Sequence, residues 1–64
     1  MTKTLKNLRY WRRKRAWTQS YLAAKSGVTI STISRIEKGL QEPRPPTMEA
    51  IAKALGVDPS EIEW

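Results

Sequence analysis

The sequence contains no cysteine, no histidine and no phenylalanine among its 64 residues. Without cysteine, neither a disulfide nor a thiolate-bound metal can stabilise the fold. Without histidine, the chain lacks the commonest general base and the commonest metal ligand, which argues against catalysis. We therefore expect a protein that is not an enzyme and that uses neither a metal nor a cofactor.

Long apolar segments are missing as well. No stretch approaches the ~20 consecutive apolar residues of a membrane span, and no apolar signal core follows the basic N-terminus. We expect no membrane association and a cytoplasmic location. A chain of this length holds one domain at most, residues 1–64, with a small hydrophobic core.

Acidic residues are absent from the first half of the chain. Lys and Arg number 12 and Asp and Glu number 6, which gives a formal charge of +6, and all the acids lie between Glu37 and Glu63. The first 32 residues carry only basic charges: Lys3, Lys6, Arg9, Arg12, Arg13, Lys14, Arg15 and Lys25. This asymmetry indicates either a face that binds a polyanion or an ordinary solubilising surface.

No segment alternates apolar and polar residues long enough to form a strand, so we expect an all-α fold. Glycines and prolines separate five candidate helices, at about residues 5–15, 18–26, 29–38, 45–55 and one or two turns from residue 58. Helical spacing of apolar residues supports the longer ones, as with Leu5, Leu8 and Trp11 in the first. Asp58 and Glu61 form a capping-box-like pair for the last.

The second and third helices carry the functional signal. Thr18 and Thr29 suit the two N-caps, and Gly27 suits the end of the second helix. Two short helices around a glycine turn form a helix-turn-helix unit, about residues 18–38, whose second helix can enter the DNA major groove. The same pattern also fits an ordinary helical hairpin inside a bundle.

Two opposite charges fall on apolar faces. Arg12 follows Leu8 by four residues, and Glu37 follows Ile33 by four residues. Either charge would be costly to bury alone, whereas together they can form a bidentate pair that ties the first helix to the third. The alternative is that both side chains reach solvent at the edge of the core.

The order and spacing of several short motifs resemble the XRE, or lambda-repressor-like, helix-turn-helix family over about residues 5–62. The motifs are Arg12, Thr18-Gln19, Leu22-Ala23, Gly27-Val28-Thr29, Ile33-Ser34-Arg35-Ile36-Glu37-Lys38-Gly39, Pro43, Ile51-Ala52 and Leu55-Gly56-Val57. The resemblance implies a compact five-helix domain that binds DNA as a dimer and controls transcription. It also implies that Gln19 contacts a phosphate and that the start of the third helix faces the bases.

The third helix offers candidate base-reading residues on the side opposite Ile33 and Ile36. Arg35 can donate two hydrogen bonds to a guanine, and small hydroxyl side chains discriminate more weakly. The candidates for base reading are Ile30, Ser31, Thr32 and Arg35, and those for phosphate contact are Gln19, Ser34, Lys38 and Arg44. Ile30 has two interpretations: the family position exposes it to a thymine methyl, whereas periodicity alone also allows a core position.

Some residues depart from the family pattern. Ala16 stands where the family often has glycine, and an alanine in a left-handed conformation is strained. Arg44 holds the N-cap position of the fourth helix, where serine is usual, and Trp11 and Trp17 replace aliphatic residues. We expect both tryptophans in the core, because a chain without phenylalanine needs bulk there.

These observations predict a sequence-specific, repressor-like transcriptional regulator of bacterial, phage or plasmid origin. Its partner is double-stranded DNA with a palindromic operator. A weak homodimer binds this DNA, and it forms either in the free protein or only on the DNA. Ile62 and Trp64 are the apolar candidates for the dimer contact. The alternatives are an antitoxin that also binds a toxin protein, and an adaptor that binds only proteins.

Overall fold

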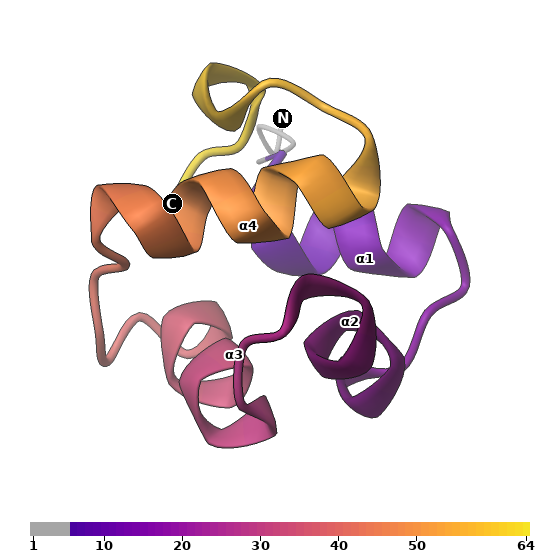
Figure 1. Cartoon of the computed structure of the whole chain (residues 1–64), viewed down its shortest axis with the longest axis horizontal. Coiled ribbons are helices and arrows are strands. Elements are labelled where there is room, and N and C mark those ends of the chain that lie inside the picture. Colours follow the sequence, from indigo (N-terminus) through magenta and orange to yellow (C-terminus); the bar gives the residue numbers. More distant parts are fainter. Residues whose placement is uncertain (1–5) are drawn as a thin grey trace, which may run out of the picture.

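The computed structural model describes residues 6–64, and these residues form an all-α fold (Figure 1). Its elements are α1 (Leu8–Lys14), α2 (Gln19–Ser26), α3 (Ile30–Glu37), α4 (Pro45–Leu55) and a 3-10 helix, η1 (Pro59–Glu61). No strand occurs within this range, although Asn7 and Glu63 form an isolated parallel β-bridge. None of the helices described is long and apolar enough to cross a membrane.

The first helix starts later than the sequence pattern predicts. The side chain of Asn7 accepts a hydrogen bond from the backbone N–H of Tyr10, which makes Asn7 the N-cap and Leu8 the first helical residue. The predicted start at Leu5 lies outside the described residues. The apolar spacing that includes Leu5 extends to the N-terminal side of Asn7. The helix nevertheless begins after Asn7, because the capping residue decides where a helix begins.

The fifth predicted helix is a single 3-10 turn of three residues. Asp58 accepts a hydrogen bond from the N–H of Ser60, and Glu61 accepts one from the N–H of Asp58, so the capping box is present. The backbone is already extended at Ile62, which ends the turn. The structure therefore has four α-helices in the described range, not five.

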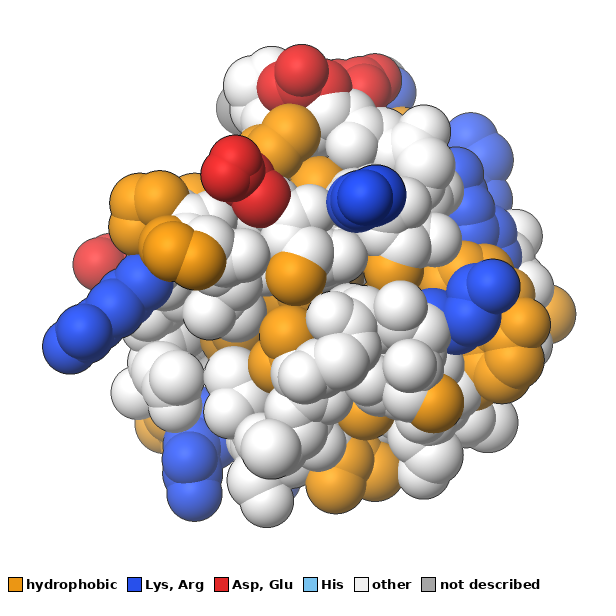
Figure 2. All heavy atoms as spheres, viewed as in Figure 1, with side chains coloured by type: hydrophobic (Ala, Val, Ile, Leu, Met, Phe, Trp, Pro, Cys, Tyr) orange, Lys and Arg blue, Asp and Glu red, His pale blue; other side chains and the backbone are white. Residues whose placement is uncertain are grey.

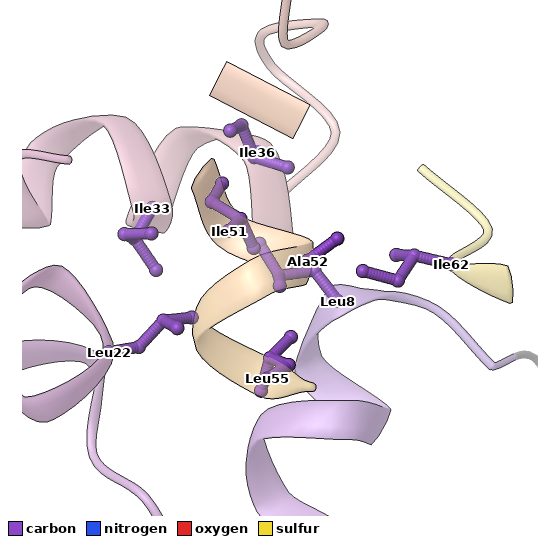
Figure 3. Close-up of a cluster of buried hydrophobic side chains, with 8 residues drawn as sticks. All are labelled: Leu8, Leu22, Ile33, Ile36, Ile51, Ala52, Leu55 and Ile62. Atoms are coloured by element: carbon purple, nitrogen blue, oxygen red, sulfur yellow. The ribbon is translucent and has the colours of Figure 1, made fainter. Parts of the chain in front are cut away.

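The core is a cluster of aliphatic side chains centred on α4 (Figure 3). All the α-helices and the segment after η1 contribute to it, with Leu8, Leu22, Ile33, Ile36, Ile51, Ala52, Leu55 and Ile62. Trp11 and Trp17 were expected inside this core but are only partly buried and pack against its edge. A cluster of branched aliphatic residues already fills the space between the helices.

Ile62 is 4% exposed and belongs to the chain's own core. The expectation that it forms an apolar contact with a second copy is therefore wrong. Trp64 is 37% exposed, and its indole Nε1 donates to the carbonyl of Pro59 at 3.2 Å. Trp64 is thus partly folded back and partly open to solvent.

The helices form two groups in space. In Figure 1, α2 and α3 lie together on the lower side of the molecule, while α1 and α4 lie above them. The 3-10 helix and the C-terminal segment lie on the far side of α4 from the α2–α3 pair. The outer surface of α2 and α3 is therefore left uncovered by the rest of the described chain.

Candidate nucleic-acid interface

The α2–α3 pair has well-defined ends. Thr18 and Thr29 are the N-caps, and each side-chain oxygen accepts a hydrogen bond from a backbone N–H three residues later. Gly27 ends α2 in the left-handed conformation, at φ 75°. Its N–H donates to the carbonyl of Ala23. Because α2 ends at Ser26 and α3 begins at Ile30, the turn between them is the three residues 27–29. Gly27 supplies the positive φ that this turn needs.

Arg12 and Glu37 form a bidentate ion pair between α1 and α3. Arg12 Nε lies 2.6 Å from Glu37 Oε2, and Arg12 Nη2 lies 3.0 Å from Oε1. The two side chains are 12% and 4% exposed, respectively. The hydrogen bond to Glu37 raises the pKa of Arg12 above its ordinary value, burial opposes this rise, and the attraction of the carboxylate adds to it.

The same pair also holds the start of α2. Arg12 Nη1 donates to the carbonyl of Trp17 at 2.7 Å, just before the N-cap of α2. Gln19, the first residue of α2, donates from Nε2 to Glu37 Oε1 at 3.2 Å. Arg12 and Glu37 therefore connect α1, α3 and the first turn of α2 through one hydrogen-bonded network.

The outer side of α3 forms a shallow, open hollow together with the first residue of α2 and the loop after α3. Most of the predicted DNA-contacting residues line it: Gln19, Ile30, Ser31, Ser34, Arg35 and Lys38, together with Leu40. Ile30 is 45% exposed, so it faces outward rather than into the core. No acidic side chain belongs to the lining of this hollow.

Thr32 and Arg44 do not line that hollow. The hydroxyl of Thr32 accepts a hydrogen bond from the hydroxyl of Thr29 at 2.8 Å, so it is already engaged at the start of α3. Arg44 is the exposed N-cap of α4, and its side chain makes no capping hydrogen bond. The guanidinium of Arg44 is therefore not used to stabilise its own helix.

A second hollow lies where α1, α2 and α3 meet. It is lined by Arg9, Arg12, Gln19, Glu37 and Lys38. Because Arg12 neutralises Glu37, the side chains of Arg9 and Lys38 give this hollow a net positive charge. Gln19 and Lys38 line both hollows, so the two are adjacent.

Acidic side chains gather elsewhere. Figure 2 shows them over α4, η1 and the loop before α4, and none is visible over α2 and α3 in this view of the described residues. The side of α2 and α3 seen in this view is thus free of the charge that would repel a polyanion.

Ala16 is the strained residue of the α1–α2 loop. Its φ is 57°, and it is the non-glycine residue with positive φ in the range that the structure describes. The positive φ confirms the strain expected for an alanine at this position. Its side chain is exposed, so nothing in the packing requires a methyl group there.

Two residues of these hollows, Arg9 and Leu40, are not predicted from the sequence. Arg9 precedes Arg12 by three residues, so helical spacing alone could have placed it near the same face. Leu40 follows Gly39, and only its high exposure beside α3 indicates that it differs from an ordinary loop leucine.

Comparison with known proteins agrees with the geometry. The profile of the helix-turn-helix family matches residues 8–62. The chain is 38% identical over 55 residues to the competence pilus inhibition repressor of Acinetobacter baylyi, and the match covers 86% of this chain and 50% of that protein. The chain thus spans about half the length of this curated relative. No solved structure matches the chain.

Proposed function

We propose that this chain, which belongs to the XRE-type helix-turn-helix family, binds double-stranded DNA in a sequence-specific manner and represses transcription. The observation that carries the proposal is the acid-free hollow on the outer side of α3, which joins a guanidinium, hydroxyls and an amide on one surface. The chemistry of DNA binding needs no catalytic step, metal or cofactor. We expect the protein in the cytoplasm of a bacterial host, where its operator DNA would lie.

In this proposal α3 enters the major groove and reads base edges. Arg35 donates two hydrogen bonds to one guanine, which is the most discriminating contact available to this helix. Ser31 adds a weaker hydrogen bond, and the exposed Ile30 contacts a thymine methyl group. Thr32 contributes least, because it does not line the outer hollow of α3.

Phosphate contacts fix the position of α3 on the duplex. Gln19, Lys38 and Ser34 line the same hollow as Arg35, so they face the strands that border the groove. Arg44 stands apart at the N-cap of α4 and reaches a phosphate farther along the backbone. Such contacts raise the affinity for every DNA sequence without choosing among them.

A single α3 reads only a few base pairs, which is too little to mark a unique genomic site. We therefore propose that two copies bind a palindromic operator, with half-sites about 34–36 Å apart. Because Ile62 is buried, Trp64 is the exposed apolar residue left at this end of the described chain. A contact built on so little apolar area is weak, so DNA itself brings the two copies together.

Selection of bound sequences from a random DNA pool tests the proposal. We expect a palindromic sequence containing guanine, with an affinity that falls steeply as the salt concentration rises. Arg35→Ala should lose about 1–3 kcal/mol of preference at one base pair, whereas Gln19→Ala should weaken binding to all sequences about equally. Melting temperatures of both variants serve as the control, because Gln19 also bonds to Glu37.

Two results would contradict the proposal. One is the absence of any enriched sequence together with salt-independent binding, which would favour an adaptor that binds only proteins. The other is an identical selection profile for the wild type and Arg35→Ala, which would refute the base-reading role of Arg35. One protein bound per operator at saturation, measured by sedimentation, would refute the dimer alone.

A further inference from the structure

Leu40 is the most exposed of the large hydrophobic side chains in the described range, at 74%. It lies in the loop between α3 and α4, directly after Gly39. A leucine in this position exposes apolar surface to water, and burying that surface against a partner would be favourable. The surroundings of Leu40 indicate which partner it fits.

The backbone of Leu40 is held firmly beside the last turn of α3. The N–H of Gly39 donates to the carbonyl of Ile36 at 3.1 Å, and the N–H of Leu40 donates to the carbonyl of Arg35 at 2.9 Å. Together these two bonds are a Schellman motif, and Gly39 has the left-handed φ of 74° that it requires. Leu40 is therefore a fixed part of the α3 surface, not a loosely placed loop residue.

In many Schellman motifs the residue after the glycine packs its apolar side chain on the residue three positions before the C-cap, which is Lys38 in α3. That position is occupied here by Arg35, the proposed guanine reader. Leu40 thus lacks the usual apolar partner at this position, and its side chain remains exposed next to a residue directed at DNA.

Leu40 also shares the outer hollow of α3 with Ile30, the other exposed aliphatic residue in its lining. The remaining residues of that hollow are polar or cationic. A ligand that fits must therefore offer both hydrogen-bonding groups and apolar groups within one small area. The DNA major groove does so, because thymine places a methyl group among the hydrogen-bonding edges of the bases.

We propose that Leu40 is a specificity-determining residue that contacts a thymine C5-methyl group in each operator half-site. This inference rests on the proposed function and extends it, because it adds a thymine to the guanine that Arg35 reads. The Schellman motif holds Leu40 at the C-terminal end of α3, whereas Ile30 is the first residue of the helix. The side chains of Leu40 and Ile30 therefore contact different thymines.

Replacing thymine by deoxyuridine tests the contact, since this exchange removes only the methyl group. With the selected operator, each thymine is replaced in turn and the affinity is measured by fluorescence anisotropy. For the wild type we expect at least one position where the loss is about fourfold, the factor that corresponds to one buried methyl or methylene group. That sensitivity should disappear in Leu40→Ala and persist in Ile30→Ala.

Gln41→Ala is the matched control, because Gln41 is the exposed neighbour of Leu40 and does not line the hollow. We expect it to leave the affinity and the deoxyuridine profile unchanged. Leu40→Ala should keep the melting temperature of the wild type, because the side chain is mostly exposed. It should weaken operator binding about 3- to 10-fold and relax the selected base at one thymine.

The possible failures are distinguishable. If the wild type selects no DNA sequence, the proposed function itself is wrong. If the wild type selects an operator but Leu40→Ala binds it equally well, or keeps every deoxyuridine effect of the wild type, then DNA binding stands and the role of Leu40 is refuted.

Discussion

Substituting Glu37 by alanine would remove the acceptor at the centre of the network that joins three helices. Arg12 would lose the acceptor of its Nε and Nη2 groups, and Gln19 would lose the acceptor of its amide. Of the contacts described above, Arg12 would retain its bond to the carbonyl of Trp17. The variant would leave a cation that is 12% exposed without its counter-charge.

The expected loss of stability is large for a domain of this size. Breaking a buried ion pair on one side costs about 3–5 kcal/mol. The lower end applies, because Arg12 keeps one hydrogen bond and some contact with water. A 64-residue domain has a total stability of about 3–10 kcal/mol. A loss of about 3 kcal/mol corresponds to a fall in melting temperature of roughly 12–24 °C.

Thermal and urea unfolding, followed by circular dichroism, measure this loss. Glu49→Ala is the control, because Glu49 is an exposed glutamate of α4, and we expect a change within about 0.5 kcal/mol. The double variant Arg12→Met/Glu37→Leu should recover most of the loss, because it leaves no unpaired charge. If Glu37→Ala melts within a few degrees of the wild type, the pair is not a buried one and the reasoning fails.

Three further predictions follow from other parts of the structure. Arg9→Gln should reduce the salt dependence of DNA binding by about one phosphate contact, a slope change near 0.9. Arg13→Gln removes an equal charge outside the hollow lined by Arg9 and Gln19, so it should change the salt dependence less. Equal salt slopes for the two variants would exclude a phosphate contact by Arg9. Ala16→Gly should raise stability by about 0.5–1 kcal/mol, because relief of the left-handed strain exceeds the added entropy of the unfolded chain; a lower melting temperature would contradict this. Hydrogen bonds from the side chain and backbone of Ser60 lower the pKa of Asp58 below its ordinary value of 3.8, so the cap of η1 is complete above that pH and is lost as the pH falls through the lowered pKa. An NMR titration of the Ser60 amide checks this, and a midpoint at or above the ordinary value would overturn it.

Local signals predicted most of the helices. Threonines before the second and third helices and glycines after them act through hydrogen bonds and φ angles that involve only neighbouring residues. The charged residues on the apolar faces of two helices similarly predicted the ion pair between Arg12 and Glu37. Errors arose where two local signals disagreed. The apolar spacing predicted that the first helix starts before Asn7, whereas the capping hydrogen bond of Asn7 starts it at Leu8.

The remaining features depend on contacts between distant segments. The bond from Gln19 to Glu37 and the bond from Arg12 to the Trp17 carbonyl exist only once three helices have packed. Burial of Ile62 likewise depends on how the segment after η1 folds over Leu8 and α4. The exposure of Leu40 is set by the direction of the loop after α3, which no periodic pattern describes.

The bridge between Asn7 and Glu63 joins the two ends of the described chain. The N–H of Glu63 donates to the carbonyl of Lys6 at 2.9 Å, and the N–H of Lys6 donates to the Glu63 carboxylate at 2.7 Å. These bonds span 57 residues, so the loop entropy for closing them is among the largest that this fold requires. Hydrogen exchange at the Glu63 amide would therefore report when the two ends of the domain separate, independently of whether the α2–α3 surface stays folded.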